Sequence, residues 1–426
     1  GRIVVRAEDS LLTPRAPEQH RDVGHTSRVQ PLVRPPRLHL GRAGEASRLE
    51  LFFDLAYVLV ILELAHGLYV DASWHGLLVM GGLFTAIWFS WMGFTLYANR
   101  FDTDDLVFRL AKLGATAAIA GCAASASDAV GKFAVPFAAS YLLGRVILLG
   151  LYGRAWRHVA DARPTIDVYL VCIGLSTVLW AVSIDVPAPE RYWLWAVAVL
   201  VDAVGPVLAT LRNDRLPLHI EHLPERFGLL VILVLGEAVG GAARGTHDAS
   251  WAAPSLAVGI LGLLLAASLW WAYFDIAATT SAHRLEQAAD GDEEADGDEP
   301  PDADQRHDLF VFGHFPLALG TVLAGVGLEG LAVHPETPGP SESAWVLAGG
   351  LALFYAGTTM VVAGTARSWR PVWPWPLVLV PVVVALGAAP LPSALLHTAA
   401  FTVVTIAAAV HGTVVGRRPE AEISVD

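Results

Sequence analysis

Long runs of apolar residues, separated by short polar segments, extend over most of the chain from about residue 50 to residue 415. A helix needs about 20 mostly apolar residues to cross the hydrocarbon core of a membrane, which is about 30 Å thick. Because helices satisfy their own backbone hydrogen bonds in lipid, the runs predict an all-α, polytopic bundle of about twelve transmembrane helices. The expected spans are 50–70, 74–97, 106–127, 133–155, 165–184, 191–211, 223–243, 251–275, 308–333, 343–365, 372–389 and 392–415.

Composition agrees with this pattern, since 54% of the 426 residues are apolar and only 16% are charged. A soluble domain of this length needs more charge, because it meets water on every side. The two cysteines, Cys122 and Cys172, lie inside apolar runs, so we expect neither a disulfide framework nor a cysteine-based metal motif. We expect no metal or other cofactor and no nucleic-acid partner. The expected partners are membrane lipids and an unidentified small solute or ion, protons included.

Basic residues alternate from one side of the predicted spans to the other. They are frequent in residues 1–47 and at every second connection, whereas the alternate connections hold only Lys132, Arg191 and Arg244. Because cytoplasmic loops carry an excess of Lys and Arg, this alternation places both termini in the cytoplasm and the protein in an inner membrane. Residues 1–47 are expected to be a disordered basic tail, and residues 416–426 a second cytoplasmic tail.

The beginnings of the first and seventh spans have similar sequences. Residues 50–63 and 225–237 each begin with Glu, continue through aromatic and branched aliphatic residues, and end with a second Glu. Similarities between later spans follow in the same order, which indicates two six-helix halves, residues 48–215 and 216–415. Because six is even, the halves share one orientation, as parallel repeats related by an axis along the membrane normal do. Residues 284–306 of the second half form an acidic loop whose composition predicts disorder.

Charged side chains inside the predicted spans are the strongest functional candidates, because an unpaired charge in hydrocarbon is costly. Glu63 and Glu237 each lie roughly 18–20 Å from the beginning of their runs, at 1.5 Å per residue, which is beyond the middle of the membrane. His66 shares a helix face with Glu63. These groups predict a proton relay or an ion-binding pair, with interhelical hydrogen bonds that fix the bundle as the alternative.

A second group of candidates lies where two spans begin. Glu50 and Asp54 share a face of the first span, and a carboxylate there also complements the positive end of a helix. Glu225 and Arg226 open the seventh span, where an ion pair or a contact with lipid headgroups is the simpler explanation. Residues 102–105 carry three aspartates, which predict either salt bridges or a magnesium site for a phosphorylated lipid. Further candidates in the spans are Arg145, Asp202, Asp275, His314, Glu329, His397 and His411.

Three segments form recognisable motifs. They are Leu49-Glu-Leu-Phe-Phe-Asp-Leu55, the segment Tyr97–Asp105, and His222–Leu229 followed by Val234-Leu-Gly-Glu237. Together they resemble the motifs of the bacterial low temperature requirement A proteins, and the resemblance covers about residues 45–415. It implies a bacterial integral membrane protein that is linked by name to growth in the cold, with an unsettled activity. The motif residues, whose roles are unassigned, are Glu50, Phe52, Phe53, Asp54, Arg100, Asp102, Glu225, Arg226 and Glu237.

The twelve expected helices, the duplication and the deeply placed carboxylates favour a secondary transporter or permease over an enzyme. In this hypothesis the two halves rock around a site lined by Glu63, Glu237 and His66. The first alternative is a membrane-embedded enzyme that acts on lipids, with its site among the charged residues at the beginnings of the first and seventh spans. The second alternative is a non-catalytic sensor or scaffold of membrane state.

Overall fold

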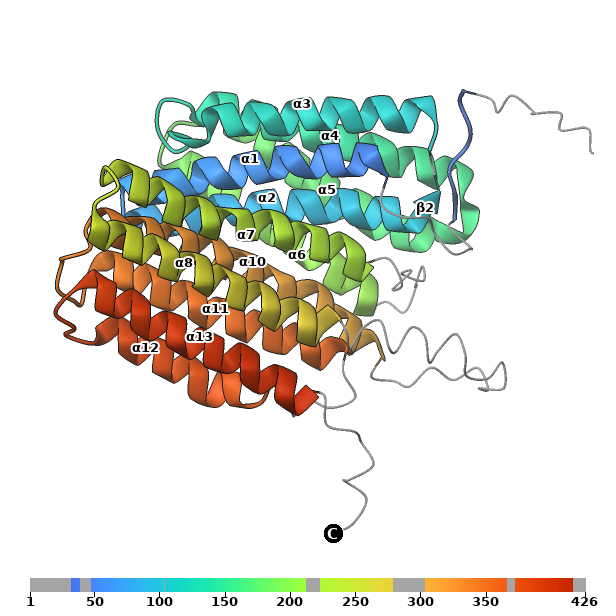
Figure 1. The fold of residues 1–426 in the computed structure, drawn as a ribbon. Coiled ribbons are helices and arrows are strands. Elements are labelled where there is room, and N and C mark those ends of the chain that lie inside the picture. Colours follow the sequence, from blue (N-terminus) through green and yellow to red (C-terminus); the bar gives the residue numbers. More distant parts are fainter. Residues whose placement is uncertain are drawn as a thin grey trace, which may run out of the picture.

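The computed structural model describes residues 32–38, 47–102, 104–211, 223–278, 303–365 and 372–416. Over these residues the protein is a bundle whose long helices run roughly side by side (Figure 1). The helices of the first half of the chain are α1 Arg48–Val70, α2 Trp74–Arg100, α3 Leu106–Ala126, α4 Ala134–His158, α5 Arg163–Ser183 and α6 Glu190–Leu211, with a 3-10 turn at Ala160–Ala162. Those of the second half are α7 Leu223–Asp248, α8 Ala253–Ala272, α10 Ala303–Val333, α11 Glu342–Thr365, α12 Val380–Ala388 and α13 Ala394–Gly416. Two π-helical turns, Tyr273–Ala278 and Trp375–Leu379, follow α8 and precede α12.

Polar residues at the helix beginnings explain where several helices start. Ser47 and Glu50 form a capping box at α1, in which each side chain accepts a hydrogen bond from the backbone amide of the other, at 3.3 and 3.0 Å. Ser73 caps α2 and Asp105 caps α3, each through one backbone amide. Glu50 and one aspartate of the 102–105 segment therefore have a structural role in helix capping.

Ten helices of the described part of the chain are long and apolar enough to cross a membrane. They correspond to ten of the twelve expected spans. The sixth expected span, α6, is not among these ten, and it carries Glu190, Arg191, Asp202 and an internal Pro206. The eleventh is the shorter apolar helix Trp375–Ala388, which at 1.5 Å per residue is about 20 Å long. The multi-span helical architecture is confirmed, whereas the count of twelve spans stays a prediction.

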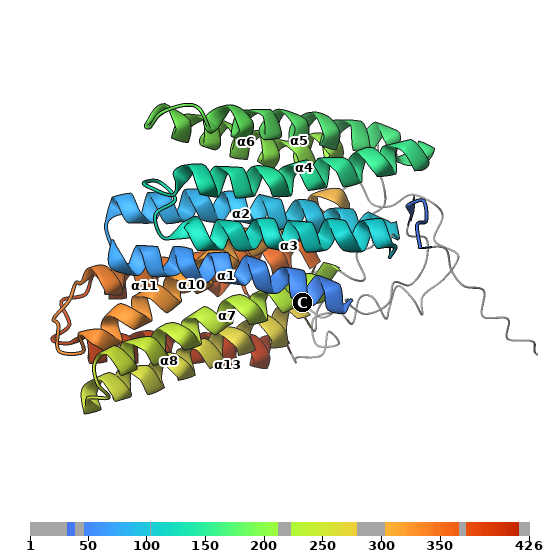
Figure 2. The ribbon, with the colours of Figure 1, turned by 90° about the horizontal axis from the view of Figure 1, so that it is seen from above.

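The same pairs of helices pack together in both halves of the chain. In the first half α1 packs on α2 and α3, α3 on α4, α4 on α5, α5 on α6 and α2 on α6. In the second half α7 packs on α8 and α10, α10 on α11, α11 on α12, α12 on α13 and α8 on α13. The halves meet where α1 packs on α7 and α10 and where α2 packs on α10 (Figure 2).

Aromatic rings fill the contact between the halves. Trp88 and Trp91 of α2 lie against Phe227 of α7, with ring centroids 6.1 and 5.1 Å apart. Trp88 also contacts Phe315 of α10 at 5.8 Å. Such edge-to-face and tilted ring contacts stabilise a packed interface beyond the area that they bury.

Two short strands pair at the end of the bundle where α1 begins and α13 finishes, which we call the N-terminal end (Figure 1). β1, Arg37–Leu38, runs antiparallel to β2, Phe101–Asp102. Residues 32–38, which we expected within a disordered tail, are therefore docked on the bundle. The remaining tail residues, 1–31, 39–46 and 417–426, lie outside the described residues. So does the acidic loop up to residue 302. The expectation for these segments stays a prediction. Residues 303–306, assigned to that loop, instead begin α10.

Candidate functional site

An ion pair joins the two halves at the N-terminal end. Nη1 of Arg226, near the beginning of α7, lies 2.5 Å from Oε2 of Glu50, near the beginning of α1. Both side chains are largely buried, with exposed fractions of 9% and 16%. The sequence identified both residues as candidates, and the structure pairs them across the halves. Glu225, the neighbouring candidate, is exposed on α7.

Asp54 lies one helical turn further along α1 and is 1% exposed. Its Oδ1 accepts a hydrogen bond from the indole Nε1 of Trp91 at 2.9 Å. Its Oδ2 has no hydrogen-bond partner among the described residues. Asp54 is therefore held against the aromatic contact between the halves with one acceptor atom unpaired.

Lys112 of α3 completes this group and is fully buried. Its Nζ lies 3.7 Å from the ring centroid of Phe53 and 5.4 Å from that of Phe94, which is a cation–π arrangement. Lys112 also interacts electrostatically with the two carboxylates and with Arg226. In the described part of the chain, neither Nζ of Lys112 nor Nε and Nη2 of Arg226 has a hydrogen-bond partner.

We call Glu50, Asp54, Lys112 and Arg226 the N-terminal cluster. Two carboxylates face two cations, so the cluster is balanced in formal charge. Lys112 was missed by the sequence analysis because the positive-inside pattern counts it among the cytoplasmic basic residues. Its position inside the apolar run 106–127 is the signal that would have found it, since a lysine at that depth needs a partner.

A second ionic group bridges α7 and α10 toward the opposite end of the bundle, which we call the far end. Nη2 of Arg244 donates to Oε1 of Glu237 at 2.5 Å and to Oε2 of Glu329 at 2.6 Å. The two carboxylates are 1% and 2% exposed, whereas the Arg244 side chain is 41% exposed. We call these three residues the far cluster. Two carboxylates face one guanidinium, so in formal charge the cluster has one carboxylate in excess.

Glycines allow α7 and α10 to approach closely enough for this bridge. A Cβ on Gly325 of α10 would lie 2.7 Å from the carbonyl oxygen of Glu237, and one on Gly245 of α7 would lie 2.5 Å from that of Glu329. Gly241 packs directly against Gly325 in the same crossing. Side chains do not tolerate contacts this short, so the small residues fix the distance between the two helices.

The structure does not bring Glu63 and His66 into the far cluster. Glu63 is half-buried on α1 and makes no hydrogen bond or ion pair within the described residues. His66 is exposed, and its ring stacks on Tyr69 at 6.4 Å between centroids. Glu63 and His66 make no hydrogen bond or ion pair with each other or with Glu237 among the described residues, and the expectation that the three line one site stays a prediction. The glycine crossing of α7 and α10 brings Glu329 to Glu237 instead.

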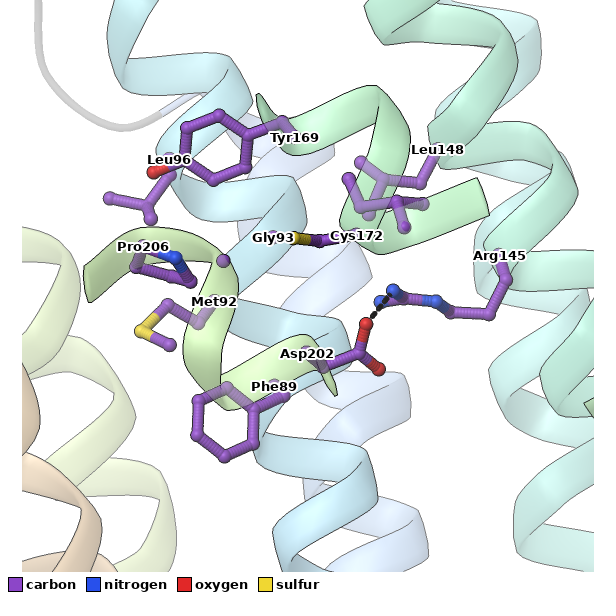
Figure 3. Close-up of a pocket in the computed structure, with 12 residues that line it drawn as sticks. Phe89, Met92, Gly93, Leu96, Arg145, Leu148, Tyr169, Cys172, Asp202 and Pro206 are labelled. Atoms are coloured by element: carbon purple, nitrogen blue, oxygen red, sulfur yellow. Dashed lines mark hydrogen bonds and ion pairs between the residues drawn. The ribbon is translucent and has the colours of Figure 1, made fainter. Parts of the chain in front are cut away.

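A third ion pair, between Arg145 of α4 and Asp202 of α6, lies inside the first half (Figure 3). The two side chains are 2% and 3% exposed. Ser176 of α5 donates a hydrogen bond to the second carboxylate oxygen of Asp202 at 2.9 Å. This pair is balanced in charge, and the sequence identified both of its members without pairing them.

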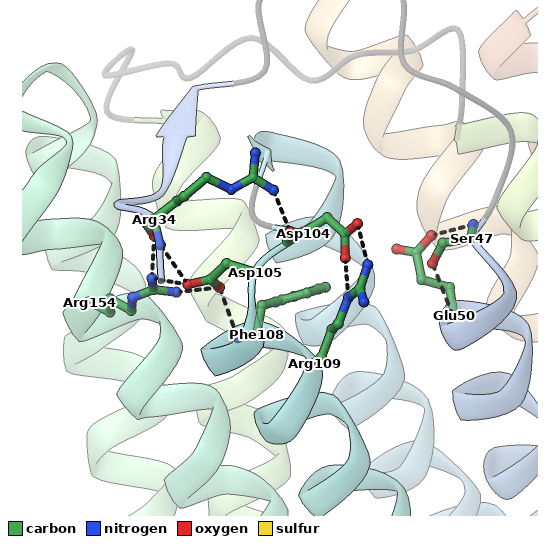
Figure 4. A network of polar contacts seen from close by, with 8 residues as sticks. All are labelled: Arg34, Ser47, Glu50, Asp104, Asp105, Phe108, Arg109 and Arg154. Carbon is green, nitrogen blue, oxygen red and sulfur yellow. Dashed lines mark hydrogen bonds and ion pairs between the residues drawn. The ribbon is translucent and has the colours of Figure 1, made fainter. Parts of the chain in front are cut away.

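Two aspartates of the 102–105 segment, Asp104 and Asp105, form ion pairs at the N-terminal end (Figure 4). Two hydrogen bonds from Arg109, at 2.7 and 2.8 Å, hold the pKa of Asp104 below its ordinary value. Asp105 accepts from Arg154 at 2.7 Å and from the backbone amide of Arg34 at 3.1 Å. Burial raises the pKa of Asp105, but these hydrogen bonds outweigh burial, and its pKa is lowered.

These ion pairs support the salt-bridge interpretation of the segment over a magnesium site. Among the described residues, no group of three or more His, Cys, Asp or Glu side chains could hold a metal ion. The side chain of Asp102 lies outside the described part. Arg100, the other charged residue of this motif, is buried with its guanidinium 4.9 Å from the ring centroid of Tyr169. The described side chains of the motif thus hold helix ends and residues 32–38 together.

Two further sequence candidates form hydrogen bonds inside the second half. Nδ1 of His314 donates to the carbonyl oxygen of Phe310 at 2.7 Å, so its Nε2 accepts from the Tyr273 hydroxyl at 2.9 Å. Asp275 accepts from the Thr413 hydroxyl at 2.6 Å. Both residues tie neighbouring helices together, as the alternative of structural hydrogen bonding predicts.

The long apolar helices and their buried ion pairs define a multi-span helical membrane protein. The chain belongs to the bacterial low temperature requirement A (LtrA) family, whose model matches residues 45–410. An uncharacterized protein of Rhizobium meliloti (strain 1021) is 28% identical over 340 residues, which are 76% of this chain and 78% of that protein. No solved structure matches the chain. The resemblance inferred from the three motifs is confirmed.

Proposed function

We propose that this protein is a secondary transporter that couples the movement of a small solute to a proton or a monovalent cation, and that the far cluster binds the coupling ion. The observation that carries the proposal is the uneven charge of that cluster, in which Glu237 and Glu329 share the guanidinium of Arg244. A buried carboxylate without a counter-ion is costly. A bound proton or cation supplies the missing positive charge.

The exposure of the far cluster also suits an ion-binding site. The carboxylates are almost completely buried, whereas the arginine in front of them is 41% exposed. A change in the position of the Arg244 side chain therefore opens or closes access to Glu237 and Glu329. The N-terminal cluster and the Arg145–Asp202 pair are buried and balanced in charge, so they need no further ion.

The arrangement of the helices supports the same proposal. The same helix pairs pack in both halves, and α13 finishes at the end where α1 begins, as an even number of spans requires. These features support twelve spans in two six-helix halves of one orientation, with both termini in the cytoplasm of the bacterium. Parallel repeats of this kind occur in secondary transporters, whose halves rock against each other.

The Glu50–Arg226 pair has a specific place in this mechanism. It joins α1 of the first half to α7 of the second at the N-terminal end. Rocking of the halves to open that end separates the two helices and breaks the ion pair. The pair therefore acts as a contact that closes the cytoplasmic side.

A two-stage experiment tests the proposal. Thermal unfolding of the purified full-length protein in mild detergent is first measured against a panel of solutes. A ligand that binds only the folded state raises the free energy of unfolding by about 2.7 kcal/mol at a hundredfold excess over its Kd. Uptake of a stabilising solute into proteoliposomes is then followed with and without a proton or sodium gradient. We expect gradient-driven uptake in the wild type and loss of that dependence in Glu329→Gln and Glu237→Gln.

Glu63→Gln is the matched control, because Glu63 lies at a similar distance along its helix but makes no ion pair in the described part of the chain. Its uptake should keep the gradient dependence of the wild type. Gradient dependence that survives in both far-cluster variants contradicts the assignment of the ion site. Stabilisation by lipids alone contradicts transport and favours a lipid-acting enzyme or a sensor of membrane state.

A further inference from the structure

The hydrogen bonds from Arg244 leave one carboxylate oxygen of the far cluster without a partner. Glu237 accepts through both of its oxygens, Oε1 at 2.5 Å and Oε2 at 3.5 Å. Glu329 instead accepts two bonds through Oε2, at 2.6 and 2.9 Å. Its Oε1 therefore accepts no hydrogen bond within the described part of the chain, and it is not among the fully buried atoms that lack a partner. The carboxylate in excess thus has an oxygen at which an ion can bind.

The backbone at the far cluster is unlike that of a sodium site. In sodium-coupled transporters, unwound backbone carbonyls and the ends of half-helices coordinate the ion. α7 and α10 are instead helical on both sides of Glu237 and Glu329. Carbonyl oxygens inside a helix accept the hydrogen bonds of the next turn, so they are not available to a metal ion. Hard metal cations take several oxygen ligands, and the far cluster supplies two carboxylates.

The position of the Arg244 guanidinium is also unfavourable for a metal ion. Nη2 of Arg244 contacts both carboxylates, so a metal ion between them would lie beside another positive charge. The guanidinium packs on α7 itself, where a Cβ added to Gly240 would come within 3.0 Å of Nη1. A proton needs neither a shell of ligands nor a cavity, because it bonds to a single carboxylate oxygen.

Neighbouring helices bring few titratable groups toward the two carboxylates. Tyr69 of α1 interacts electrostatically with Glu329, and Arg244 and Glu329 are the charged groups that act on Glu237. α8, which packs on both helices, carries no charged residue. The titratable side chains toward the far end of the other helices that pack on α7 or α10 are Glu63, His66 and Tyr69 of α1, His75 of α2, Glu342 of α11 and His397 of α13.

We propose that the ion bound by the far cluster is a proton rather than a metal cation such as sodium. The proposal rests on the proposed function, in which this cluster binds the coupling ion. A proton transferred from hydronium at the far end breaks one O–H bond there and forms one with a carboxylate oxygen. Arg244 and the remaining carboxylate then balance each other in charge. Because the two carboxylates share one guanidinium, they titrate as a pair, and the proton belongs to the pair.

Proton and metal binding are measured separately on the purified full-length protein in mild detergent. Potentiometric titration counts the protons bound between mildly alkaline and mildly acidic pH, above the range in which ordinary carboxylates titrate. It is run in sodium, potassium and choline chloride of equal ionic strength. We expect the wild type to bind one proton more than Glu329→Gln, with the same curve in all three salts. The midpoint temperature of unfolding should also be the same in the three salts, because no metal ion binds the folded state.

Two further variants support the comparison. Glu237→Gln removes the other carboxylate of the pair and should lose the same proton, so it serves if Glu329→Gln does not fold. Glu63→Gln is the matched control, because it removes a half-buried carboxylate that makes no ion pair in the described part of the chain. This control should bind as many protons as the wild type.

The outcomes separate this proposal from the proposed function. Sodium or potassium that displaces the proton, or that raises the unfolding temperature of the wild type but not of Glu329→Gln, overturns the proposal and leaves the far cluster a site for a metal cation. Equal proton counts in the wild type and both far-cluster variants, with no effect of any salt, overturn both the proton and the ion site of the proposed function.

Discussion

The N-terminal cluster and the far cluster both bury two carboxylates beside cations, yet they differ in charge balance and exposure. In the former, two fully or largely buried cations face the carboxylates across α1, α3 and α7. In the latter, one arginine that is 41% exposed serves both carboxylates between α7 and α10. A balanced cluster stabilises the contact between the halves, whereas an unbalanced one needs a proton or cation. In the proposed function, charge balance more than burial distinguishes the two clusters.

The largest effect should come from breaking the balanced cluster. Arg226→Met leaves Glu50 buried without its partner, which should lower the free energy of unfolding by about 3–5 kcal/mol. Thermal unfolding in detergent measures this loss, and Glu50→Gln combined with Arg226→Met should recover much of it. Arg109→Met is the control, because its pair with Asp104 is 58% and 65% exposed and should therefore contribute little to stability. Equal losses in the two single variants would show that burial of the Glu50 pair has no energetic consequence.

The next largest effect concerns the helix crossing that builds the far cluster. Gly241→Ala places a methyl group against the Gly325 backbone, which should cost about 1–3 kcal/mol through overpacking and separate Arg244 from Glu329. Gly236→Ala on the same helix is the matched control, because a Cβ there meets nothing within 4 Å. That control should leave stability unchanged or raise it by about 0.5–1 kcal/mol, since Ala favours helices. If Gly236→Ala proves less stable to unfolding than Gly241→Ala, the close crossing of α7 and α10 at Gly241 is contradicted.

A smaller effect should follow from removing the excess charge itself. Glu329→Gln leaves one carboxylate for one guanidinium, so the free energy of unfolding at neutral pH should change by less than about 1.5 kcal/mol. Glu50→Gln removes a needed anion from the balanced cluster and should be the more destabilising of the two. The comparison of both Gln variants by thermal unfolding therefore reports charge balance directly. If Glu329→Gln lowers the free energy of unfolding more than Glu50→Gln does, the far cluster has no carboxylate in excess.

Much of the bundle follows from the sequence, because a run of apolar residues long enough to cross lipid has few structural alternatives. The sequence also identifies Glu50, Arg226 and Glu237 as candidates, since charges near or inside such runs need partners. It does not reveal that Glu329 is the partner of Glu237, because that contact depends on where α7 and α10 cross at their glycines. The position of Lys112 inside an apolar run marks it as a candidate, but only the fold shows which partners it meets.

The docking of residues 32–38 on the bundle also could not be predicted from the sequence. It depends on the backbone and side chain of Arg34 meeting Asp104 and Asp105, about 70 residues later. Arg154 then joins the same group from α4. Contacts between residues so distant in the chain leave no periodic pattern in the sequence. A basic segment that contains prolines is therefore predicted to be a disordered tail.

The smallest predicted effect concerns the docking of residues 32–38 on the bundle, which should change with pH only in strong acid. The pKa of Asp105 lies below its ordinary value of 3.8 in the folded protein, so docking is fully stabilised above that ordinary value. The stabilisation is lost as the pH falls through the lowered pKa, because protonation removes the charge that Arg154 binds. A spin label on V33C should gain mobility only in strong acid in the wild type and already at neutral pH in Arg154→Met. Equal mobility in both proteins at neutral pH would contradict the ion pair as the anchor.

The most direct test of the central claim is infrared spectroscopy of the far cluster. The carbonyl stretch of a protonated carboxyl group is recorded while pH and sodium concentration are varied in the wild type, Glu237→Gln, Glu329→Gln and Glu63→Gln. We predict a carboxyl band that responds to pH or sodium in the wild type and in Glu63→Gln, and that is absent from both far-cluster variants. A band that persists in the far-cluster variants, or a wild type with no such band, would contradict the claim that Glu237 and Glu329 bind a proton or a cation.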